Sequence, residues 1–108
     1  MEKQFKQISF IGFGLINSSL ARIVKNNSLA KKIIAYSRTE ETRTKIKKLN
    51  IVDEVADDLN NAVRNADLIV LGVPVGAMEN IIKECSGSIK QGAILTDVGS
   101  IKKSIIDS

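Results

Sequence analysis

A short apolar run, residues 8–11, stops at Gly12, and an amphipathic pattern begins just after Gly14. Apolar residues recur at positions 16, 20, 23 and 24, which is helical spacing, so residues 15–25 are predicted to form a helix. Two glycines therefore join a strand directly to a helix. This start is typical of a βαβ unit, which restricts the chain to a parallel sheet with helical crossovers.

The same alternation continues along the chain. Strands are predicted over residues 32–36, 52–55, 68–71 and 93–98, and helices begin near residues 39, 57, 75 and 101. The continuously apolar run 68–71 is typical of a parallel strand that is covered on both faces. The sequence thus predicts one α/β domain of the Rossmann type, a doubly wound parallel sheet of five strands in the order 3-2-1-4-5.

Composition excludes several classes of protein. The 108 residues suffice for one domain, and no apolar run approaches the roughly 18 residues that cross a bilayer. The net charge of +4 comes from lysines and arginines spread along the chain, and aromatic residues are few, so we expect no nucleic-acid partner. One cysteine and no histidine leave no disulfide and no metal cluster. Lacking a signal-peptide pattern, the chain is predicted to be cytoplasmic and not to bind membranes.

The glycine turn is the most informative segment for function. In a Gly-x-Gly-x-x-Gly fingerprint, the first glycine allows the tight turn and the second lets the backbone approach a pyrophosphate, which the helix N-terminus attracts. Gly12 and Gly14 fill the first two positions, but Asn17 replaces the third glycine, where a side chain is expected to crowd the contact between helix and strand. We predict a dinucleotide site that includes the whole turn, residues Gly12, Phe13, Gly14, Leu15, Ile16 and Asn17.

The end of the second strand indicates which dinucleotide binds. NAD-binding domains usually carry an acidic residue there, which holds the ribose 2′-hydroxyl. This chain has Ser37-Arg38-Thr39 instead, and a guanidinium with two hydroxyls suits a 2′-phosphate. NADP is therefore predicted in preference to NAD. If Arg38 is a solvated surface residue instead, Glu40 or Glu41 is left to reach the ribose, and NAD is the cofactor.

Five segments resemble the front part of prephenate, arogenate and cyclohexadienyl dehydrogenases. That family typically opens with Gly-x-Gly-Leu-Ile-Gly-Gly-Ser-Leu-Ala, and its fifth strand ends in Thr-Asp-x-x-Ser-x-Lys. The resemblance covers nearly the whole chain, in the family's order and spacing. The matching segments are residues 12–21, Val52-Asp53-Glu54, Ala66-Asp67-Leu68-Ile69-Val70, Val73-Pro74-Val75 and Thr96-Asp97-Val98-Gly99-Ser100-Ile101-Lys102.

The resemblance implies a reaction and further site residues. In that family a ring carbon gives a hydride to the nicotinamide while the ring loses CO2 and becomes aromatic, a step in tyrosine biosynthesis. Ser100 is implied to lie near the nicotinamide as an auxiliary catalytic group, with Asp97 and Lys102 supporting its loop. Val73 and Pro74 are implied to lie beneath the cofactor. Ser-Arg after the second strand is similar to the NADP-using arogenate dehydrogenases. Ser100 also suits the N-cap of the last helix, and the two roles are compatible.

The family's catalytic histidine lies in a Gly-His-Pro motif beyond the segment that ends at Lys102, and this chain has no histidine. The helical domain that binds substrate and forms most of the homodimer contact is likewise expected beyond residue 108. Residues 1–108 are therefore predicted to be the NAD(P)-binding domain, inactive on its own toward prephenate or arogenate. Two alternatives stay open: a stand-alone nucleotide-sensing regulatory module, and another NAD(P)-dependent dehydrogenase or reductase with a similar front half.

The remaining reactive side chains are predicted to be structural. Met78 and Cys85 share the apolar face of a helix and are assigned to the core. Four carboxylates are interpreted as helix caps and loop residues rather than a catalytic pair: Asp53, Glu54, Asp57 and Asp58.

Overall fold

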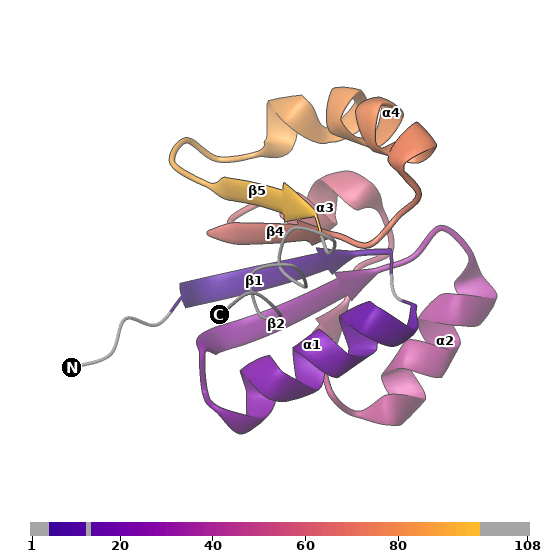
Figure 1. Ribbon diagram of the computed structural model, residues 1–108, viewed down its shortest axis with the longest axis vertical. Coiled ribbons are helices and arrows are strands. Elements are labelled where there is room, and N and C mark those ends of the chain that lie inside the picture. The colour runs from indigo at the N-terminus through magenta and orange to yellow at the C-terminus, as the bar shows by residue number, and fades with distance from the viewer. Residues whose placement is uncertain (1–4, 13, 98–108) are drawn as a thin grey trace.

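The computed structural model describes residues 5–12 and 14–97, and its centre is a parallel sheet with the strand order β3-β2-β1-β4-β5 (Figure 1). This confirms the predicted class and strand order. The strands are β1 (Phe5–Ile11), β2 (Ala30–Tyr36), β3 (Glu54–Val55), β4 (Leu68–Leu71) and β5 (Ile94–Asp97). The helices are α1 (Leu15–Asn26), α2 (Glu40–Leu49), α3 (Leu59–Val63), α4 (Val75–Cys85) and the 3-10 turn η1 (Ser86–Ser88). The helix predicted from residue 101 lies outside the described residues.

The first strand is longer than the apolar pattern predicted, because polar side chains at its start are buried. Gln7 donates from Nε2 to the Ser9 hydroxyl oxygen (3.1 Å) and to the Arg64 carbonyl (3.2 Å). Ser9 in turn donates from Oγ to the Ala62 carbonyl at 2.6 Å. These bonds satisfy the buried polar groups and tie β1 to α3 and the loop that follows it.

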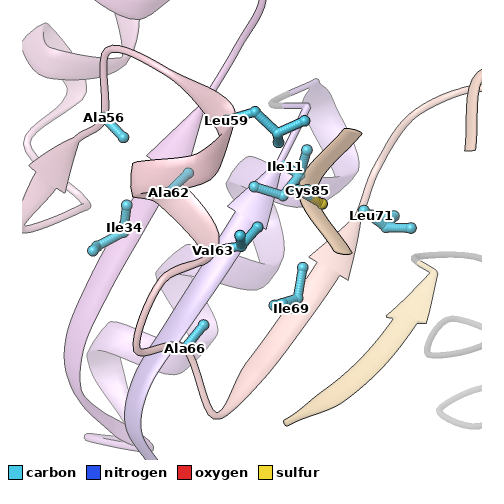
Figure 2. Close-up of a cluster of buried hydrophobic side chains, with 10 residues drawn as sticks. All are labelled: Ile11, Ile34, Ala56, Leu59, Ala62, Val63, Ala66, Ile69, Leu71 and Cys85. Atoms are coloured by element: carbon cyan, nitrogen blue, oxygen red, sulfur yellow. The ribbon is translucent and has the colours of Figure 1, made fainter. Parts of the chain in front are cut away.

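Helices cover both faces of the sheet, with α1 and α2 on one side and α3 and α4 on the other (Figure 1). Residues of α1 pack with β1, β2 and β4 on the first face. Figure 2 shows the cluster on the second face, where short side chains of α3 lie against the sheet and Cys85 joins them from α4. Burial raises the pKa of the Cys85 thiol, so the predicted core role of this residue is confirmed and it stays protonated. Met78 packs against the same cluster, as predicted.

Two large apolar side chains of α1 and α2 lie outside the core. Ile23 is 48% exposed and Leu49 is 45% exposed. The buried residues of α1 include Asn17, Ala21 and Val24, so Ile23 falls at the edge of that stripe. Leu49 is the last residue of α2, next to the left-handed C-cap residue Asn50, and only Ile46 of this helix is buried.

The predicted capping role of Asp58 is confirmed, and Thr39 is a further helix cap. The Thr39 hydroxyl accepts from the Thr42 backbone N–H at the start of α2, and Asp58 accepts from the Asn61 N–H (2.8 Å) at the start of α3. The interpretation of Asp53 as a structural carboxylate is also confirmed. Its Oδ2 accepts from the Ile33 N–H at 2.7 Å, which fixes the segment before β3 to β2. Such bonds satisfy backbone donors that no helix or strand partner reaches.

One carboxylate joins three strands at their N-terminal ends. Asp67 Oδ2 accepts from the backbone N–H groups of Lys6 (2.7 Å) and Gln7 (3.1 Å), while Oδ1 pairs with the Lys90 ammonium. The Asp67 carbonyl accepts from the Ile94 N–H at 2.8 Å. The hydrogen bond from Lys90 and those from the backbone N–H groups lower the pKa of Asp67 below 3.8, and partial burial only partly opposes this shift.

Asp67→Asn is expected to lower the free energy of unfolding by about 1–2 kcal/mol at pH 7, the usual worth of hydrogen bonds to a charged group. A carboxylate whose pKa is depressed on folding stabilises the native state above the unfolded-state pKa, and this contribution is lost as the pH falls through the folded-state pKa. The gap between the parent chain and the variant is therefore expected to close below about pH 4 in urea titrations.

Glu79→Gln is the matched control, because Glu79 pairs with Lys83 (3.6 Å) on the exposed face of α4. An exposed pair of this kind contributes about 0.5 kcal/mol or less. A gap between the parent chain and Asp67→Asn that persists unchanged at pH 3 would contradict the role assigned to the Asp67 charge.

Candidate functional site

The strand order creates a crevice at the carboxyl ends of β1 and β4, because the chain leaves β1 toward one edge of the sheet and returns at β4 toward the other. Gly12 follows β1 and Gly72 follows β4. Gly12 donates its N–H to the Tyr36 carbonyl, and Gly72 donates to the Ile11 carbonyl, each at 2.8 Å. The glycine turn is thus held firmly against both neighbouring strands, at the place where doubly wound sheets bind ligands.

The fold requires glycine at position 12, independently of any ligand. Its φ of +80° is left-handed, and a Cβ added there would lie 2.6 Å from Val73 Cγ1 and 2.8 Å from the Gly72 carbonyl oxygen. Only glycine adopts this backbone without strain and leaves room for the segment that follows β4. The prediction that Gly12 makes the tight turn is therefore supported by its geometry.

Gly14 has a different environment. It is the N-cap of α1, and a Cβ added there would meet no atom within 4 Å. As a glycine it supplies no side-chain cap to the first turn of α1, and that turn holds no acidic residue. Folding alone does not demand glycine at this position. Open space beside uncapped helix N–H groups is suited to an anion that approaches the backbone closely.

Asn17 fits without crowding because a second glycine faces it. The side chain is 1% exposed, and its Nδ2 donates to the Gly12 carbonyl. A Cβ on Gly72 would lie 2.3 Å from that Nδ2, so Gly72 provides the space that Asn17 fills. Asn17, at the third fingerprint position, therefore stabilises the glycine turn, and its side chain fits in the space that Gly72 leaves.

A cavity of about 430 Å³ continues from the glycine turn along the ends of β1 and β2. Its walls come from the ends of these strands, the loop after β2, and the helices α3 and α4. The lining residues are Ile11, Gly12, Tyr36, Ser37, Arg38, Leu59, Val73, Ala77, Asn80, Ile81 and Glu84. An apolar floor with a few polar groups at the rim is typical of a small-molecule site.

The structure brings together four of the residues predicted from the sequence. Gly12, Ser37, Arg38 and Val73 line the cavity. Thr39 instead caps α2, and its hydroxyl donates to Thr42 Oγ1 at 2.8 Å.

The other predicted residues either do not line the cavity or lie beyond the described part. Pro74 is exposed and is the N-cap of α4, and Asp97 ends β5. Leu15 and Ile16 begin α1. Phe13, Ser100 and Lys102 lie outside the described residues, so their predicted roles stay predictions.

Sequence reasoning missed the wall that α4 contributes. Ala77, Asn80, Ile81 and Glu84 recur at i, i+3, i+4 and i+7, which places them on one stripe of the helix. This stripe lies beside the buried one that the apolar pattern revealed. Two of its members are polar and exposed, so only the position of α4 after the crossover strand β4 could have pointed to them.

Fold and site together define a dinucleotide-binding domain of the doubly wound class. The family model described as "Prephenate dehydrogenase, nucleotide-binding domain" matches residues 20–108. The chain is 41% identical over 102 residues to a cyclohexadienyl dehydrogenase of Zymomonas mobilis, which covers 94% of this chain and 35% of the relative. The chain therefore belongs to the prephenate dehydrogenase family and represents its nucleotide-binding domain.

Other relatives support the same family assignment. A Bacillus subtilis prephenate dehydrogenase is 31% identical over 108 residues, with coverage of 99% of this chain and 29% of the relative. The crystal structure of Synechocystis arogenate dehydrogenase superposes with a TM-score of 0.76 at 28% identity, over 84% of this chain and 32% of that one. The chain spans about a third of the length of the curated relatives it matches. The family match favours this assignment over a nucleotide-sensing module or an unrelated reductase.

Within residues 5–12 and 14–97, no helix is long and apolar enough to cross a membrane. The same residues contain no group of histidine, cysteine, aspartate or glutamate that could hold a metal ion.

Proposed function

We propose that this domain binds NADP in preference to NAD, in the cavity between the glycine turn and α4. The observation that carries the proposal is the composition of the cavity wall at the end of β2, where Ser37 and Arg38 stand and no carboxylate does. A guanidinium and a hydroxyl suit a 2′-phosphate, whereas a carboxylate would repel it. The pyrophosphate is assigned to the open space beside Gly14 at the N-terminus of α1.

The alternative of NAD with an acidic ribose ligand has less support. Glu40 and Glu41 belong to the exposed first turn of α2, and neither lines the cavity. Glu41 pairs with Lys45 at 3.8 Å on the outer side of the helix. Carboxylates in the first turn complement the helix dipole, which accounts for both residues without a ligand.

We assign the adenine ring to the deeper part of the cavity. Leu59 and Ile81 supply apolar surface there, and Tyr36 supplies an aromatic ring. The polar side chains of Asn80 and Glu84 stand at the rim, where donors and acceptors of a base edge are within reach of solvent. This division is usual for cofactor sites, where apolar walls bind and a few polar groups orient.

We further propose that the whole protein oxidises prephenate or arogenate, with the bound nicotinamide accepting the hydride. Asp97 at the end of β5 would support the loop carrying Ser100 and Lys102, and the Ser100 hydroxyl would hydrogen-bond near the reacting atoms. Val73 and Pro74 would bound the cofactor from the end of β4. A helical domain with a catalytic histidine, a substrate pocket and a homodimer contact would complete a cytoplasmic enzyme, and residues 1–108 alone would be inactive.

The cofactor proposal is tested by titrating the chain separately with NADPH and NADH in a calorimeter. Tighter binding of NADPH is expected. Arg38→Ala is expected to weaken NADPH about 10- to 100-fold, the worth of a charge-assisted hydrogen bond, and to change NADH about twofold or less.

Arg22→Ala is the matched control, because Arg22 is an exposed arginine of α1 that does not line the cavity. It is expected to leave both affinities unchanged within about twofold, since isolated surface charges contribute little. A preference for NADH that Arg38→Ala does not alter would reject the NADP assignment and leave the fold and family in place.

A further inference from the structure

A second arginine, in addition to Arg38, forms hydrogen bonds to the backbone of the loop between β2 and α2. Arg43, in the second turn of α2, donates from Nη1 to the carbonyl oxygens of Ser37 (2.7 Å) and Arg38 (3.2 Å). One guanidinium thus fixes two consecutive peptide groups of the loop that carries the proposed 2′-phosphate ligands. Both bonds come from one nitrogen of a rigid, planar guanidinium, so the directions of its two N–H groups are fixed.

Fixing these carbonyls also fixes the N–H groups that follow them. In a planar trans peptide the C=O and N–H point in opposite directions, so the N–H groups of Arg38 and Thr39 point away from Arg43. Among the described residues, no hydrogen bond engages either N–H. Two free backbone donors therefore stand beside the Ser37 hydroxyl and the Arg38 side chain, a set that favours an anion.

Arg43 is itself restrained. Its guanidinium carbon lies 5.9 Å from the centre of the Tyr36 ring, within the range of a cation–π contact, and the residue is half-buried. Tyr36 also lines the cavity. The stacked ring and the two carbonyls hold the arginine in one arrangement, so little ordering is left for the moment of ligand binding.

We propose that Arg43 is a positioning residue for NADP, which presents the Ser37–Thr39 loop to the 2′-phosphate without occupying the phosphate site itself. This inference rests on the proposed preference for NADP. It adds a determinant of cofactor choice that acts through the loop backbone. The charge of Arg43 alone is not enough for this role, since a lysine at the same position carries that charge without the planar guanidinium that fixes the donor directions.

The test compares Arg43→Met, Arg43→Lys and Arg38→Ala with the parent chain, all titrated with NADPH and NADH. Both Arg43 variants are expected to weaken NADPH about tenfold and NADH about twofold or less. Amide chemical shifts provide a second readout. In the parent chain, 2′,5′-ADP is expected to move the Arg38 and Thr39 amide resonances downfield, and both Arg43 variants are expected to lose this response.

Lys45→Met is the matched control, because it removes one positive charge from α2 at a side chain that contacts Glu41 and not the loop. It is expected to leave both affinities within about twofold of the parent values. Wild-type NADPH affinity in Arg43→Lys would overturn the inference, since charge alone would then suffice. An equal loss of NADPH and NADH in both Arg43 variants would overturn it as well, since it would indicate general damage.

If the proposed NADP preference is wrong, the measured affinities differ from those expected if only the role of Arg43 is wrong. If the parent chain binds NADPH no more tightly than NADH, or binds neither, the NADP preference fails and the inference fails with it. If NADPH is preferred and Arg38→Ala abolishes the preference while both Arg43 variants keep it, the proposed function stands and only the role of Arg43 is rejected.

Discussion

Gly72→Ala is expected to lower the free energy of unfolding by about 3 kcal/mol, at the upper end of the usual cost of overpacking a core. A Cβ on Gly72 would lie 2.3 Å from Asn17 Nδ2, 2.8 Å from Asn17 Cγ and 3.0 Å from the Gly12 carbonyl oxygen. Asn17 is buried and bonded to Gly12, so it cannot swing aside into solvent. The substitution must therefore push α1 or the glycine turn away from the end of β4. Urea denaturation measures the loss.

The cause of that loss is tested by removing the facing side chain. Asn17→Ala alone is expected to change stability by about 1 kcal/mol or less, because it deletes one hydrogen bond but also a buried Oδ1 that has no partner among the described residues. In the double variant Asn17→Ala/Gly72→Ala, most of the stability lost in Gly72→Ala is expected to return. A double variant as unstable as Gly72→Ala, or less stable still, would show that Asn17 and Gly72 are not a matched pair.

This pair also shows where reading the sequence reached its limit. The strand and helix pattern was predictable because each element carries its own periodicity, and short connections leave few topologies. The accommodation of Asn17 was not, since Gly72 is 55 positions away and follows a different strand. A side chain at a helix–strand contact was expected to crowd that contact, and the space for it is visible only when the two segments lie side by side. The buried start of β1 was missed for the same reason, because Gln7 bonds to the carbonyl of Arg64 after α3 and Ser9 bonds to the carbonyl of Ala62 in α3.

The candidate site also contains residues that the sequence predicts and residues that it does not. Gly12, Gly14 and Ser37-Arg38 stand at fixed positions after their strands, so local motif and strand order were enough to nominate them. Arg43 carries no motif, and its importance comes from the two carbonyls that it bonds. The α4 wall of the cavity is polar at Asn80 and Glu84, so an apolar pattern could not reveal it. Residues that act on the backbone or form the far wall of a cleft emerge only from the assembled fold.

Gly12→Ala and Gly14→Ala are expected to separate folding from cofactor binding at the same turn. Gly12→Ala forces a side chain into φ +80° and against Val73 and the Gly72 carbonyl. The left-handed backbone costs about 1–3 kcal/mol and the overpacking a similar amount, so unfolding is expected to be easier by about 2–6 kcal/mol. That is a large part of the 5–15 kcal/mol or so that holds a typical domain together.

Gly14→Ala is the matched substitution, since within the described residues its new methyl group meets no atom within 4 Å beyond its chain neighbours. The melting temperature and the urea midpoint are expected to stay close to the parent values, because exchanging glycine for alanine at an N-cap costs about 1 kcal/mol or less. NADPH affinity is expected to fall about tenfold or more, since the methyl group enters the space assigned to the pyrophosphate. Unchanged NADPH binding in Gly14→Ala would move the pyrophosphate away from this turn. A parent-like stability of Gly12→Ala would mean that the turn tolerates a side chain at φ +80°, against the reason given for its first glycine.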